Sequence, residues 1–571
     1  MKWIPRRAFL GLLLFVGFVV LSLPASPVAG AAPQAVATPP PAPAPTPQTP
    51  APTANPPAPV PAPTPETKEY NDANRLTDPD KKIEAMRAFI KKYPDSPRKT
   101  SASQVIFDTL VKSRPGDRDG ILEAAKAVID GASEGFRGSS YSRIANRLVE
   151  TNIMLDDAEK FATDGLKMFD EEERKRTERS RATHLATIGR IRIKQGRIAE
   201  AEQALKDAYA ANPEIPAAAV GLAELSEKKG DTKTALDYWT TAALTGRLSV
   251  DDRGKFEALY TKVNGSTDTL DAALDTKYKT AFPSPIHPEA YKATGARTNR
   301  MVLAEVFTGA GCPPCVSVDL GFDAALERYA RKDVAVLMYH LHIPAPDPLT
   351  NQWTDSRGKA YSITGVPNFA VDGEKDNRGG GGRENTKVSY DRIVAKIDKA
   401  LEVAPEAELQ LTASLDGNTL RVKATPSKVK DGKDKVQMQI VLVEELISYS
   451  GENGVRFHPM VVRSVANLDV PPKATTPAAP PTGGFTVDRA NPTAAEYTFD
   501  LAKISADAKT YLDDYEKNGR HGTITFSKKP VQMNTANLSI VAFLQEEPSK
   551  KVLQSAYVKV GSGTTTSSAG R

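Results

Sequence analysis

One stretch of the sequence decides the fold, MVLAEVFTGAGCPPC at residues 301–315. Its two cysteines, Cys312 and Cys315, are the only cysteines among the 571 residues. Because neither has another partner for a disulfide framework, their spacing indicates thiol–disulfide chemistry rather than structural bridging. The apolar run Met301–Phe307 predicts a buried strand, and Thr308–Gly311 predicts a flexible turn that leads into the cysteines.

A Cys-x-x-Cys pair is redox-active when it opens a helix. The free N–H groups and the positive dipole end of the helix stabilise a thiolate and can lower its pKa from about 8.5 to roughly 3.5–7.5. We therefore expect Cys312 to be the attacking thiolate and Cys315, one turn later and more buried, to resolve the mixed disulfide. Pro313 is tolerated in the first turn, where its missing N–H would have no partner anyway, and Pro314 stiffens the turn.

The chain around these cysteines resembles the thioredoxin-like superfamily over residues 298–403. In that superfamily a strand leads into Cys-x-x-Cys, a helix, a strand and a helix follow, and a cis-proline then faces the cysteines. Residues 333–339 (DVAVLMY) correspond to the second strand, Val366-Pro367 corresponds to the cis-proline position, and 389–401 would be the closing helix. The resemblance implies an α/β domain with thiol–disulfide oxidoreductase activity.

The resemblance also assigns roles to neighbours of the cysteines. It implies that Pro367 belongs to the catalytic site, where it keeps the substrate strand in place, and that Val366, Pro313 and Pro314 line the substrate groove. Thioredoxin itself carries a buried carboxylate six residues before its first cysteine, where it assists proton transfer. Val306 stands at that position here, so the chain departs from the pattern in how it handles the proton.

Two histidines offer a competing chemistry. His340 and His342 are two residues apart, so on a strand their side chains point to the same face. They lie just past 333–339, at the sheet edge where the cysteine helix also begins. Together with Cys312 and Cys315 they would form a Cys2His2 set for zinc or copper; otherwise they cap the strand or line the groove. Redox chemistry already explains the cysteines, so we expect no metal and no cofactor.

The N-terminus predicts export. Residues 1–31 combine a basic start, an apolar run at 8–23 and the cleavage motif Ala29-Gly30-Ala31. The apolar run is shorter than the ~20 residues of a membrane span. Residues 32–68, rich in Pro and Ala, are expected to be a disordered, extended linker. We therefore expect a protein of the periplasm or cell envelope, or a secreted one, that contacts a membrane only if the signal is uncleaved.

Residues 69–265 are helical in pattern, and 266–297 form a connector. A repeat of 34 residues within the helical part resembles the tetratricopeptide family. It aligns Gly196, Ala201, Leu205 and Ala208 with Gly230, Ala235, Trp239 and Ala242. We expect an α-helical solenoid whose concave surface either is a packing scaffold or docks a protein partner.

Residues 404–560 change to alternating, strand-like segments, which predict an all-β sandwich. The expected strands are Glu408–Leu415, Thr419–Ala424, Val436–Val443, Tyr497–Leu501, Thr523–Phe526, Leu538–Leu544 and Val552–Val560. A low-complexity loop at 471–484 is expected within this domain, and 561–571 is expected to be a disordered tail.

Part of this region resembles a second family. Segments at 440–445, 453–463 and 541–545 are similar to the C-terminal part of the outer-membrane-protein-28 related family. That family also joins a thioredoxin-like module to a β domain. The resemblance therefore implies the order of modules, and it adds nothing on mechanism.

Charge and composition exclude one class of function. The chain carries 75 basic and 70 acidic residues, with both signs interspersed, so no basic stripe for nucleic acid is present. Two hypotheses follow. The first is an exported enzyme that exchanges disulfides with thiol or disulfide groups of envelope proteins. The second is a non-enzymatic assembly or adaptor protein that uses the repeats to bind protein, with the metal-binding protein as a further alternative.

Overall fold

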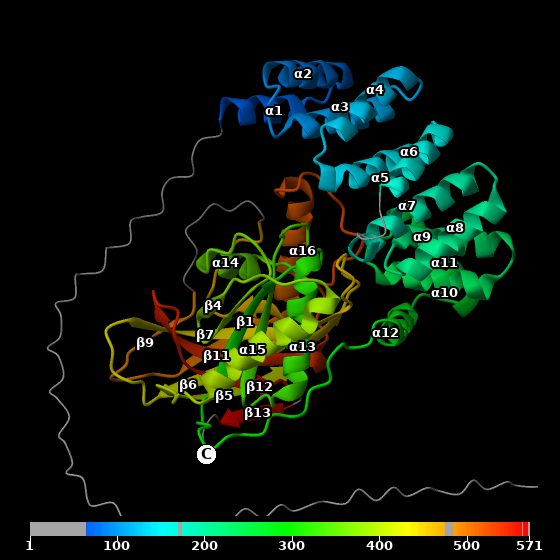
Figure 1. Cartoon of the computed structure of the whole chain (residues 1–571). Coiled ribbons are helices and arrows are strands. Elements are labelled where there is room, and N and C mark those ends of the chain that lie inside the picture. Colours follow the sequence, from blue (N-terminus) through cyan, green and yellow to red (C-terminus); the bar gives the residue numbers. More distant parts are fainter. Residues whose placement is uncertain (1–63, 169–173, 474–482, 562, 569–571) are drawn as a thin grey trace, which may run out of the picture. The chain divides into compact units, whose positions relative to one another are not determined.

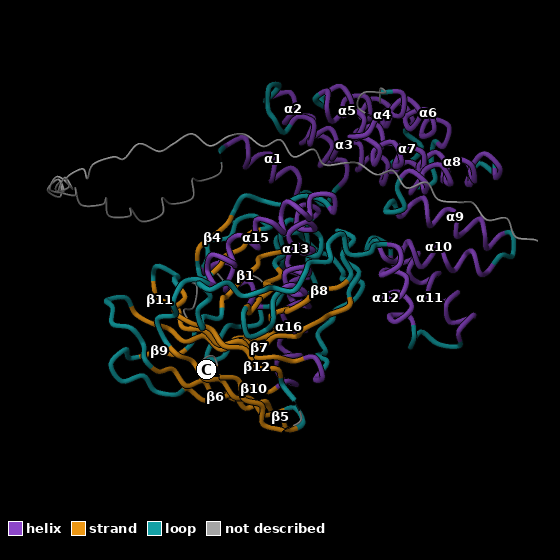
Figure 2. The backbone as a smooth tube through the Cα atoms, turned by 60° about the horizontal axis from the view of Figure 1, so that its bottom comes forward, coloured by secondary structure: helices purple, strands orange, loops and turns teal. Residues whose placement is uncertain are grey.

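The structure is a computed structural model that describes residues 64–168, 174–473, 483–561 and 563–568. The expected signal segment at 1–31, most of the expected linker and part of the expected low-complexity loop lie outside these described residues. Within them, helices come first and strands appear only after residue 300, as the purple and orange segments of Figure 2 show.

A helical region precedes the described strands (Figure 1). Its helices are α1 (Pro65–Arg75), α2 (Pro79–Lys92), α3 (Lys99–Ser113), α4 (Arg118–Asp130), α5 (Glu134–Glu150), α6 (Leu155–Lys167), α7 (Arg174–Lys194), α8 (Ile198–Ala211), α9 (Pro216–Lys228), α10 (Thr232–Leu244), α11 (Val250–Asn264) and α12 (Leu270–Ala281). Helix α1 starts before the predicted boundary at residue 69, because Pro65 suits a first turn and the Thr64 side chain caps the helix. Helix α12 occupies part of the predicted connector.

The 34-residue repeat corresponds to the helix pairs α7–α8 and α9–α10. Gly196 and Gly230 take the same place in the turn within each pair, with φ of 76° and 75°, values that favour glycine. Leu205 packs where small residues let helices approach, because a Cβ on Gly189 or Gly221 would lie 2.5 or 2.8 Å from its side chain. The predicted helical repeats are therefore confirmed.

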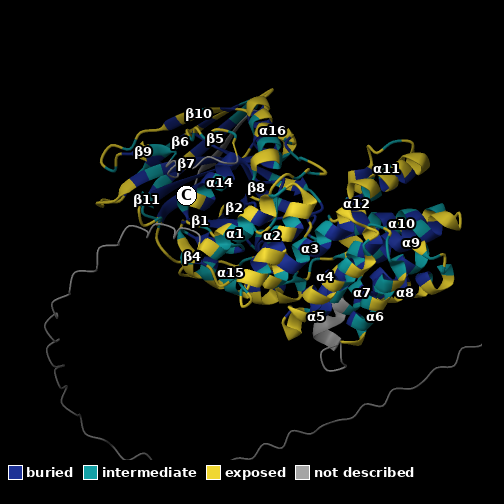
Figure 3. Cartoon of the chain, turned by 90° about the horizontal axis from the view of Figure 1, so that it is seen from above, coloured by how far each residue is buried: buried dark blue, intermediate teal, exposed yellow. Residues whose placement is uncertain are grey.

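Nine strands after the helical region form one sheet, ordered β12-β11-β7-β8-β2-β1-β3-β4, with β9 paired to β7. Their bounds are β1 (Val302–Thr308), β2 (Val334–His340), β3 (Asn368–Val371), β4 (Glu374–Asp376), β7 (Lys435–Ser448), β8 (Phe457–Val465), β9 (Phe485–Val487), β11 (Leu538–Glu547) and β12 (Val552–Lys559). Strands β1 and β2 are parallel and buried at every position, as their dark blue colour in Figure 3 indicates. Strand β3 pairs antiparallel with β1, and β4 with β3.

Three helices and two short 3-10 turns accompany strands β1 to β4. Helix α13 (Val316–Arg328) links β1 to β2, α14 (Gln352–Ala360) links β2 to β3, and α15 (Thr386–Leu401) follows β4. The turns η1 (Pro313–Cys315) and η2 (Arg383–Asn385) start α13 and α15. Helices α13 and α15 pack closely at Gly321, where an added Cβ would lie 3.0 Å from Ile393.

The strands predicted as a separate sandwich are divided between two sheets. The predicted strands found as β7, β11 and β12 belong to the nine-stranded sheet, together with β8 and β9, which were not predicted. The predicted strands found as β5, β6 and β10 belong to a four-stranded sheet with the order β10-β6-β5-β13. The strands of the second sheet are β5 (Glu408–Asp416), β6 (Thr419–Ser427), β10 (Ala495–Asp500) and β13 (Gly563–Ser568). Helix α16 (Leu501–Asn518) also lies in this region, so the region differs from the predicted all-β domain.

Two local predictions differ from the structure for reasons of backbone hydrogen bonding. Residues 523–526 are not a strand, because the N–H groups of Ile524 and Phe526 donate to the backbone and side chain of Glu516 on α16, at 2.9 and 2.7 Å. The predicted tail contains β13, which pairs antiparallel with β5. Threonine suits strands, and the β5 edge offers unpaired backbone groups.

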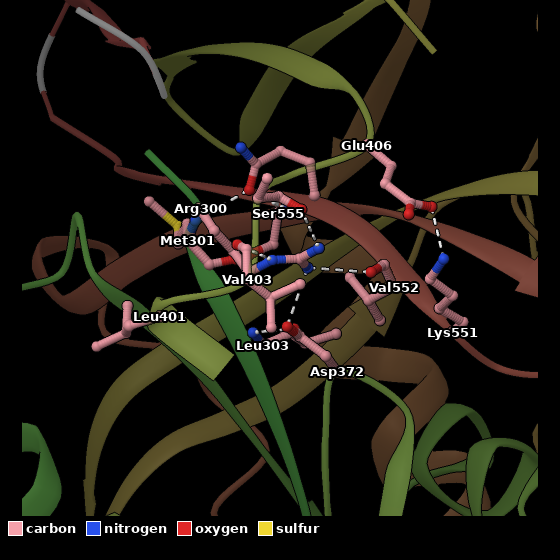
Figure 4. A network of polar contacts seen from close by, with 12 residues as sticks. Arg300, Met301, Leu303, Asp372, Leu401, Val403, Glu406, Lys551, Val552 and Ser555 are labelled. Atoms are coloured by element: carbon pink, nitrogen blue, oxygen red, sulfur yellow. Dashed lines mark hydrogen bonds and ion pairs between the residues drawn. The ribbon is translucent and has the colours of Figure 1, made fainter. Parts of the chain in front are cut away.

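The buried guanidinium of Arg300 joins three segments to the start of β1 (Figure 4). Its Nη1 donates to Asp372 Oδ2 at 3.0 Å and to the Val552 carbonyl at 3.1 Å. Its Nε and Nη2 donate to the carbonyls of Val403 and Ala404, each at 3.1 Å. The β3–β4 turn, the start of β12 and the end of α15 are thereby held together by one side chain.

We predict that Arg300→Leu lowers the free energy of unfolding by about 3–5 kcal/mol, because it leaves a buried carboxylate and several carbonyls without their donor. Urea unfolding followed by tryptophan fluorescence measures the loss. Arg421→Leu, at an exposed position of β6, is the control and is expected to change stability by under about 0.5 kcal/mol. Equal effects of the two substitutions would contradict the role given to Arg300.

Candidate functional site

The two cysteines form a disulfide where β1 gives way to α13. Cys312 and Cys315 flank the Pro-Pro pair of η1, and their Cα atoms are 5.3 Å apart. Both cysteines have 0% of their surface exposed. The expectation that Cys312 is the more accessible of the two therefore does not hold in this state. Access to the disulfide depends on the segments that cover it.

Val366 and Pro367 lie beside the disulfide. The peptide bond between them is cis, and the Val366 carbonyl oxygen lies 3.7 Å from the Cys312 Sγ. The structure thus brings the predicted site residues together around one sulfur. Pro313 and Pro314 complete this surface as the first residues of η1.

A run of four glycines, Gly379–Gly382, lies against the Cys-x-x-Cys turn from the β4–η2 connection. A Cβ on Gly380 would meet the Pro314 carbonyl oxygen at 2.2 Å and the Pro367 ring at 2.9 Å. The N–H of Ser317 donates to a carbonyl of the same loop at 3.0 Å. Only glycine permits so close an approach, so this glycine loop packs directly against the turn.

The β7–β8 loop covers the turn that precedes the disulfide. The N–H of Asn453 donates to the Ala310 carbonyl at 2.9 Å, and its side-chain amide donates to the Cys312 carbonyl at 3.4 Å. Arg456, 1% exposed, follows this loop and donates to Asp275 of α12 at 2.6 Å. The helical region therefore takes part in holding the cover in place.

Asp347 organises the buried polar groups beside the cysteine turn. Its carboxylate accepts hydrogen bonds from the backbone N–H groups of Ala310, at 2.6 Å, and Leu349, at 2.8 Å, and lies 2.8 Å from His340 Nδ1. Burial alone would raise the pKa of Asp347, but His340 and these N–H groups lower it below its ordinary value. Asp347 is thus an ionised group that fixes the turn.

The Cys2His2 alternative is not assembled. His340 uses Nδ1 toward Asp347, and His342 Nδ1 accepts the Asp347 backbone N–H at 2.9 Å. Cys312 and Cys315 are bonded to each other. In the part of the chain that the structure describes, no group of three or more His, Cys, Asp and Glu side chains is arranged to hold a metal ion. Burial lowers the pKa of His342 to about 3, so its imidazole is neutral.

Glu305, the carboxylate next to Val306, is committed to another partner. Arg357 binds it through two hydrogen bonds of 2.7 and 3.0 Å, and the Tyr361 hydroxyl donates to it at 2.5 Å. Adjacent residues of a strand point to opposite faces, so Glu305 and Val306 face different sides of β1. Both Glu305 carboxylate oxygens are therefore occupied by partners within the sheet, and Glu305 does not replace the acid that is absent at position 306.

Asp319 is a buried acid close to the cysteines in the chain, and the sequence pattern did not single it out. It lies on α13 one turn after Cys315 and is 4% exposed. One carboxyl oxygen accepts the Thr308 hydroxyl at 2.9 Å, while the other has no hydrogen-bond partner among the described residues. Burial raises the pKa of Asp319 to about 7. The sequence contains a signal for this residue, because Asp319 lies among the apolar residues of the predicted helix.

No protein-family model matches the chain, and no curated protein matches it. Solved structures give partial likenesses. HBP35 of Porphyromonas gingivalis is 12% identical with a TM-score of 0.31, over 46% of this chain and 75% of that one. PilF of Pseudomonas aeruginosa is 15% identical with a TM-score of 0.26, over 38% and 94%. PilW, a type IV pilus biogenesis factor, is 18% identical with a TM-score of 0.24, over 38% and 92%.

These likenesses carry no argument about this chain, because their TM-scores are low. Among residues 64–168, 174–473, 483–561 and 563–568, no helix combines the length and the apolar composition that crossing a bilayer requires.

We predict that Asp319→Asn stabilises the protein at pH 8 by on the order of 2–4 kcal/mol. The folded pKa of Asp319 is raised, so the stability tied to its proton is complete below the unfolded pKa near 4 and is lost as pH rises through about 7. Asparagine never ionises and avoids that loss. Urea unfolding from pH 5 to 8 should show the variant gaining on the wild type as pH rises.

Asp119→Asn, at an exposed position of α4, is the control for the pH series, and its difference from the wild type should stay constant. If the Asp319→Asn difference were equally flat between pH 5 and 8, Asp319 would not be a buried acid with a raised pKa.

Proposed function

We propose that this protein is an exported thiol–disulfide oxidoreductase with a thioredoxin-like domain. The observation that carries the proposal is the Cys312–Cys315 disulfide at the β1–α13 junction, with the Val366 carbonyl 3.7 Å from one sulfur. The strand order β2-β1-β3-β4, with α13 between parallel strands and an antiparallel β3–β4 hairpin, supports the assignment of the domain.

The proposed reaction moves two electrons and two protons between a protein dithiol and the disulfide. A substrate thiolate attacks Cys312 Sγ, the bond to Cys315 breaks, and Cys315 leaves as a thiolate that takes a proton. The second substrate thiolate then attacks the substrate sulfur of the mixed disulfide and releases Cys312 as a thiolate, which takes the second proton. The substrate is oxidised to a disulfide and the Cys312–Cys315 pair is reduced; the same steps run backwards from the reduced protein.

We assign proton transfer in this reaction to Asp319. It follows Cys315 by one helical turn, has a carboxyl oxygen without a partner among the described residues, and has a pKa of about 7. A buried carboxyl with such a pKa exchanges a proton readily at neutral pH. Glu305 and Asp347 are unsuited to the task, because the carboxylate oxygens of each are already occupied by hydrogen-bond donors.

Chemistry at the disulfide requires its cover to open. With both cysteines 0% exposed, no thiolate can reach Cys312 Sγ until a neighbouring segment moves, and the glycine loop Gly379–Gly382 is one such segment. The loop contacts the turn through backbone and proline groups, so we propose that it moves aside when a substrate binds. Movements of such loops take microseconds to milliseconds and often set the rate of an enzyme.

Location and partners belong to the same proposal. The signal pattern at 1–31 supports export, and an intact disulfide suits an oxidising compartment outside the cytoplasm. We propose that the helical repeats dock protein partners and thereby raise the local concentration of substrate near the disulfide.

A second candidate function rests on the burial of both sulfurs. A sealed disulfide can act only as a cross-link, in which case the protein is an adaptor that binds partners through its repeats. The two candidates differ in whether a substrate thiol ever becomes bonded to Cys312.

We predict that Cys315→Ser accumulates a mixed disulfide with a thiol peptide activated as its nitropyridyl disulfide, whereas Cys312→Ser does not. Only the first variant keeps the attacking sulfur while it removes the group that would release the peptide. Mass spectrometry of the intact protein reports the adduct, and circular dichroism checks that both variants fold. Equal adduct formation by the two variants, or none by either, would leave the cross-link candidate in place.

We predict that Gly380→Ala speeds reduction of the disulfide by dithiothreitol by roughly tenfold, equivalent to about 1.4 kcal/mol, because its Cβ cannot coexist with the Pro314 carbonyl. Gly365→Ala is the matched control, since an added Cβ there meets nothing within 4 Å. Loss of the disulfide is followed by thiol alkylation. An unchanged rate in Gly380→Ala would show that the glycine loop does not limit access.

A further inference from the structure

A cavity of about 630 Å³ lies where α12, α13 and the β7–β8 hairpin meet, and the proposed redox reaction does not use it. Its volume is within the range of sites for small molecules. On one side, Leu320 and Val455 of its lining pack with Val316, the residue after Cys315. The cavity is thus a neighbour of the disulfide but separate from it.

The cavity has an aromatic and aliphatic wall. Tyr278 and Phe457 form an edge-to-face pair with ring centres 5.3 Å apart, and Phe282 packs 5.5 Å from Tyr278. Leu446, also in the lining, is 42% exposed, although large apolar side chains are usually covered. Such a wall favours an apolar ligand body over a fully polar one.

One polar side chain in the cavity, Arg383, lies over the Tyr278 and Phe282 rings and has N–H donors that are not used within the described part of the chain. Arg383 donates from Nη2 to the Tyr278 hydroxyl at 3.0 Å. Its Nε and Nη1 are buried and have no hydrogen-bond acceptor among the described residues. A buried guanidinium with unused donors is costly for the fold, and a ligand carboxylate would satisfy them.

The acidic side chains of the cavity do not oppose an anion. Asp275 is paired with Arg456 at 2.6 Å, and Glu327 lies at the rim, half exposed, 3.5 Å from His287. Burial raises the pKa of Asp323 well above its ordinary value, against the opposing effect of the Arg383 charge. Lys279 and Arg331 add positive charge to the lining. Together with Arg383 they make the cavity lining favourable for an anionic group.

We propose that this cavity binds a small apolar carboxylate. The carboxylate accepts hydrogen bonds from the unused N–H groups of Arg383, and the apolar body packs against Tyr278, Phe282 and Phe457. The ligand class is an aliphatic or aromatic monocarboxylic acid. Because the site does not depend on exchange at the cysteines, it is expected also in a protein that lacks both thiols.

The test uses decanoate and decanol as probes in isothermal titration calorimetry with the full chain. Decanoate is expected to bind with a Kd below about 100 μM, and decanol at least about tenfold more weakly because it cannot pair with the guanidinium. Arg383→Gln and Leu446→Trp, the second of which places a larger side chain at an exposed position of the lining, are each expected to weaken decanoate by about tenfold or more. The Cys312→Ser, Cys315→Ser double variant should bind as the wild type does.

Arg378→Gln is the control for net charge. Arg378 lies at the other end of the glycine loop, is paired with Asp376 and is not part of this cavity. Equal binding of acid and alcohol, or wild-type affinity in both cavity variants, would overturn the proposal. A peptide with an apolar, free carboxyl terminus that binds more tightly than decanoate, while its amidated form does not bind, would overturn the small-molecule assignment in favour of a chain terminus.

Discussion

A single position of backbone pairing joins the two halves of the nine-stranded sheet. Strands β2 and β8 are parallel neighbours only where Met338 lies opposite Val461, whereas β1 pairs with β2, and β7 with β8, along most of their lengths. The joint therefore depends on buried side chains. Arg300 ties β1 to β12, and Arg357 ties Glu305 of β1 to Gln545 of β11 at 2.9 Å.

The same joint builds the candidate site. Once β8 lies beside β2, the β7–β8 loop falls over the turn before Cys312, and Arg456 connects that loop to α12. The three buried carboxylates around this region differ in their donors. Glu305 has an arginine and Asp347 has two backbone N–H groups, while Asp319 has only one hydroxyl. That difference separates Asp347, whose donors lower its pKa, from Asp319, whose pKa is raised by burial to about 7.

Local pattern predicts the elements well and their neighbours poorly. The apolar runs at 301–307 and 333–339 are found as β1 and β2, and the helix expected at 389–401 is found within α15. These segments are recognisable because the apolar pattern that indicates burial lies within each segment. Alternating apolar and polar residues identify a strand but do not show which strand lies beside it. The prediction of a separate sandwich was wrong for this reason. The strand predicted at 523–526 is wrong for a related reason, since the backbone hydrogen-bond partner of this segment lies on α16.

The candidate site shows the same division. The cysteines and Val366-Pro367 could be found from spacing and resemblance, because the motif itself contains them. The closeness of Gly380 to Pro314 and the pairing of Asp347 with His340 depend on chain packing. Their residue types alone, a glycine run and an aspartate in a loop, are common in loops of every kind.

The equilibrium reduction potential of the Cys312–Cys315 pair tests the central claim most directly. It can be measured by titrating the intact protein against glutathione or dithiothreitol and counting free thiols by mass after alkylation. A disulfide that exchanges with substrates should have a potential between about −270 and −120 mV, the span of thiol–disulfide oxidoreductases. A value below about −300 mV, the range of structural disulfides, would contradict the account and leave the pair as a cross-link.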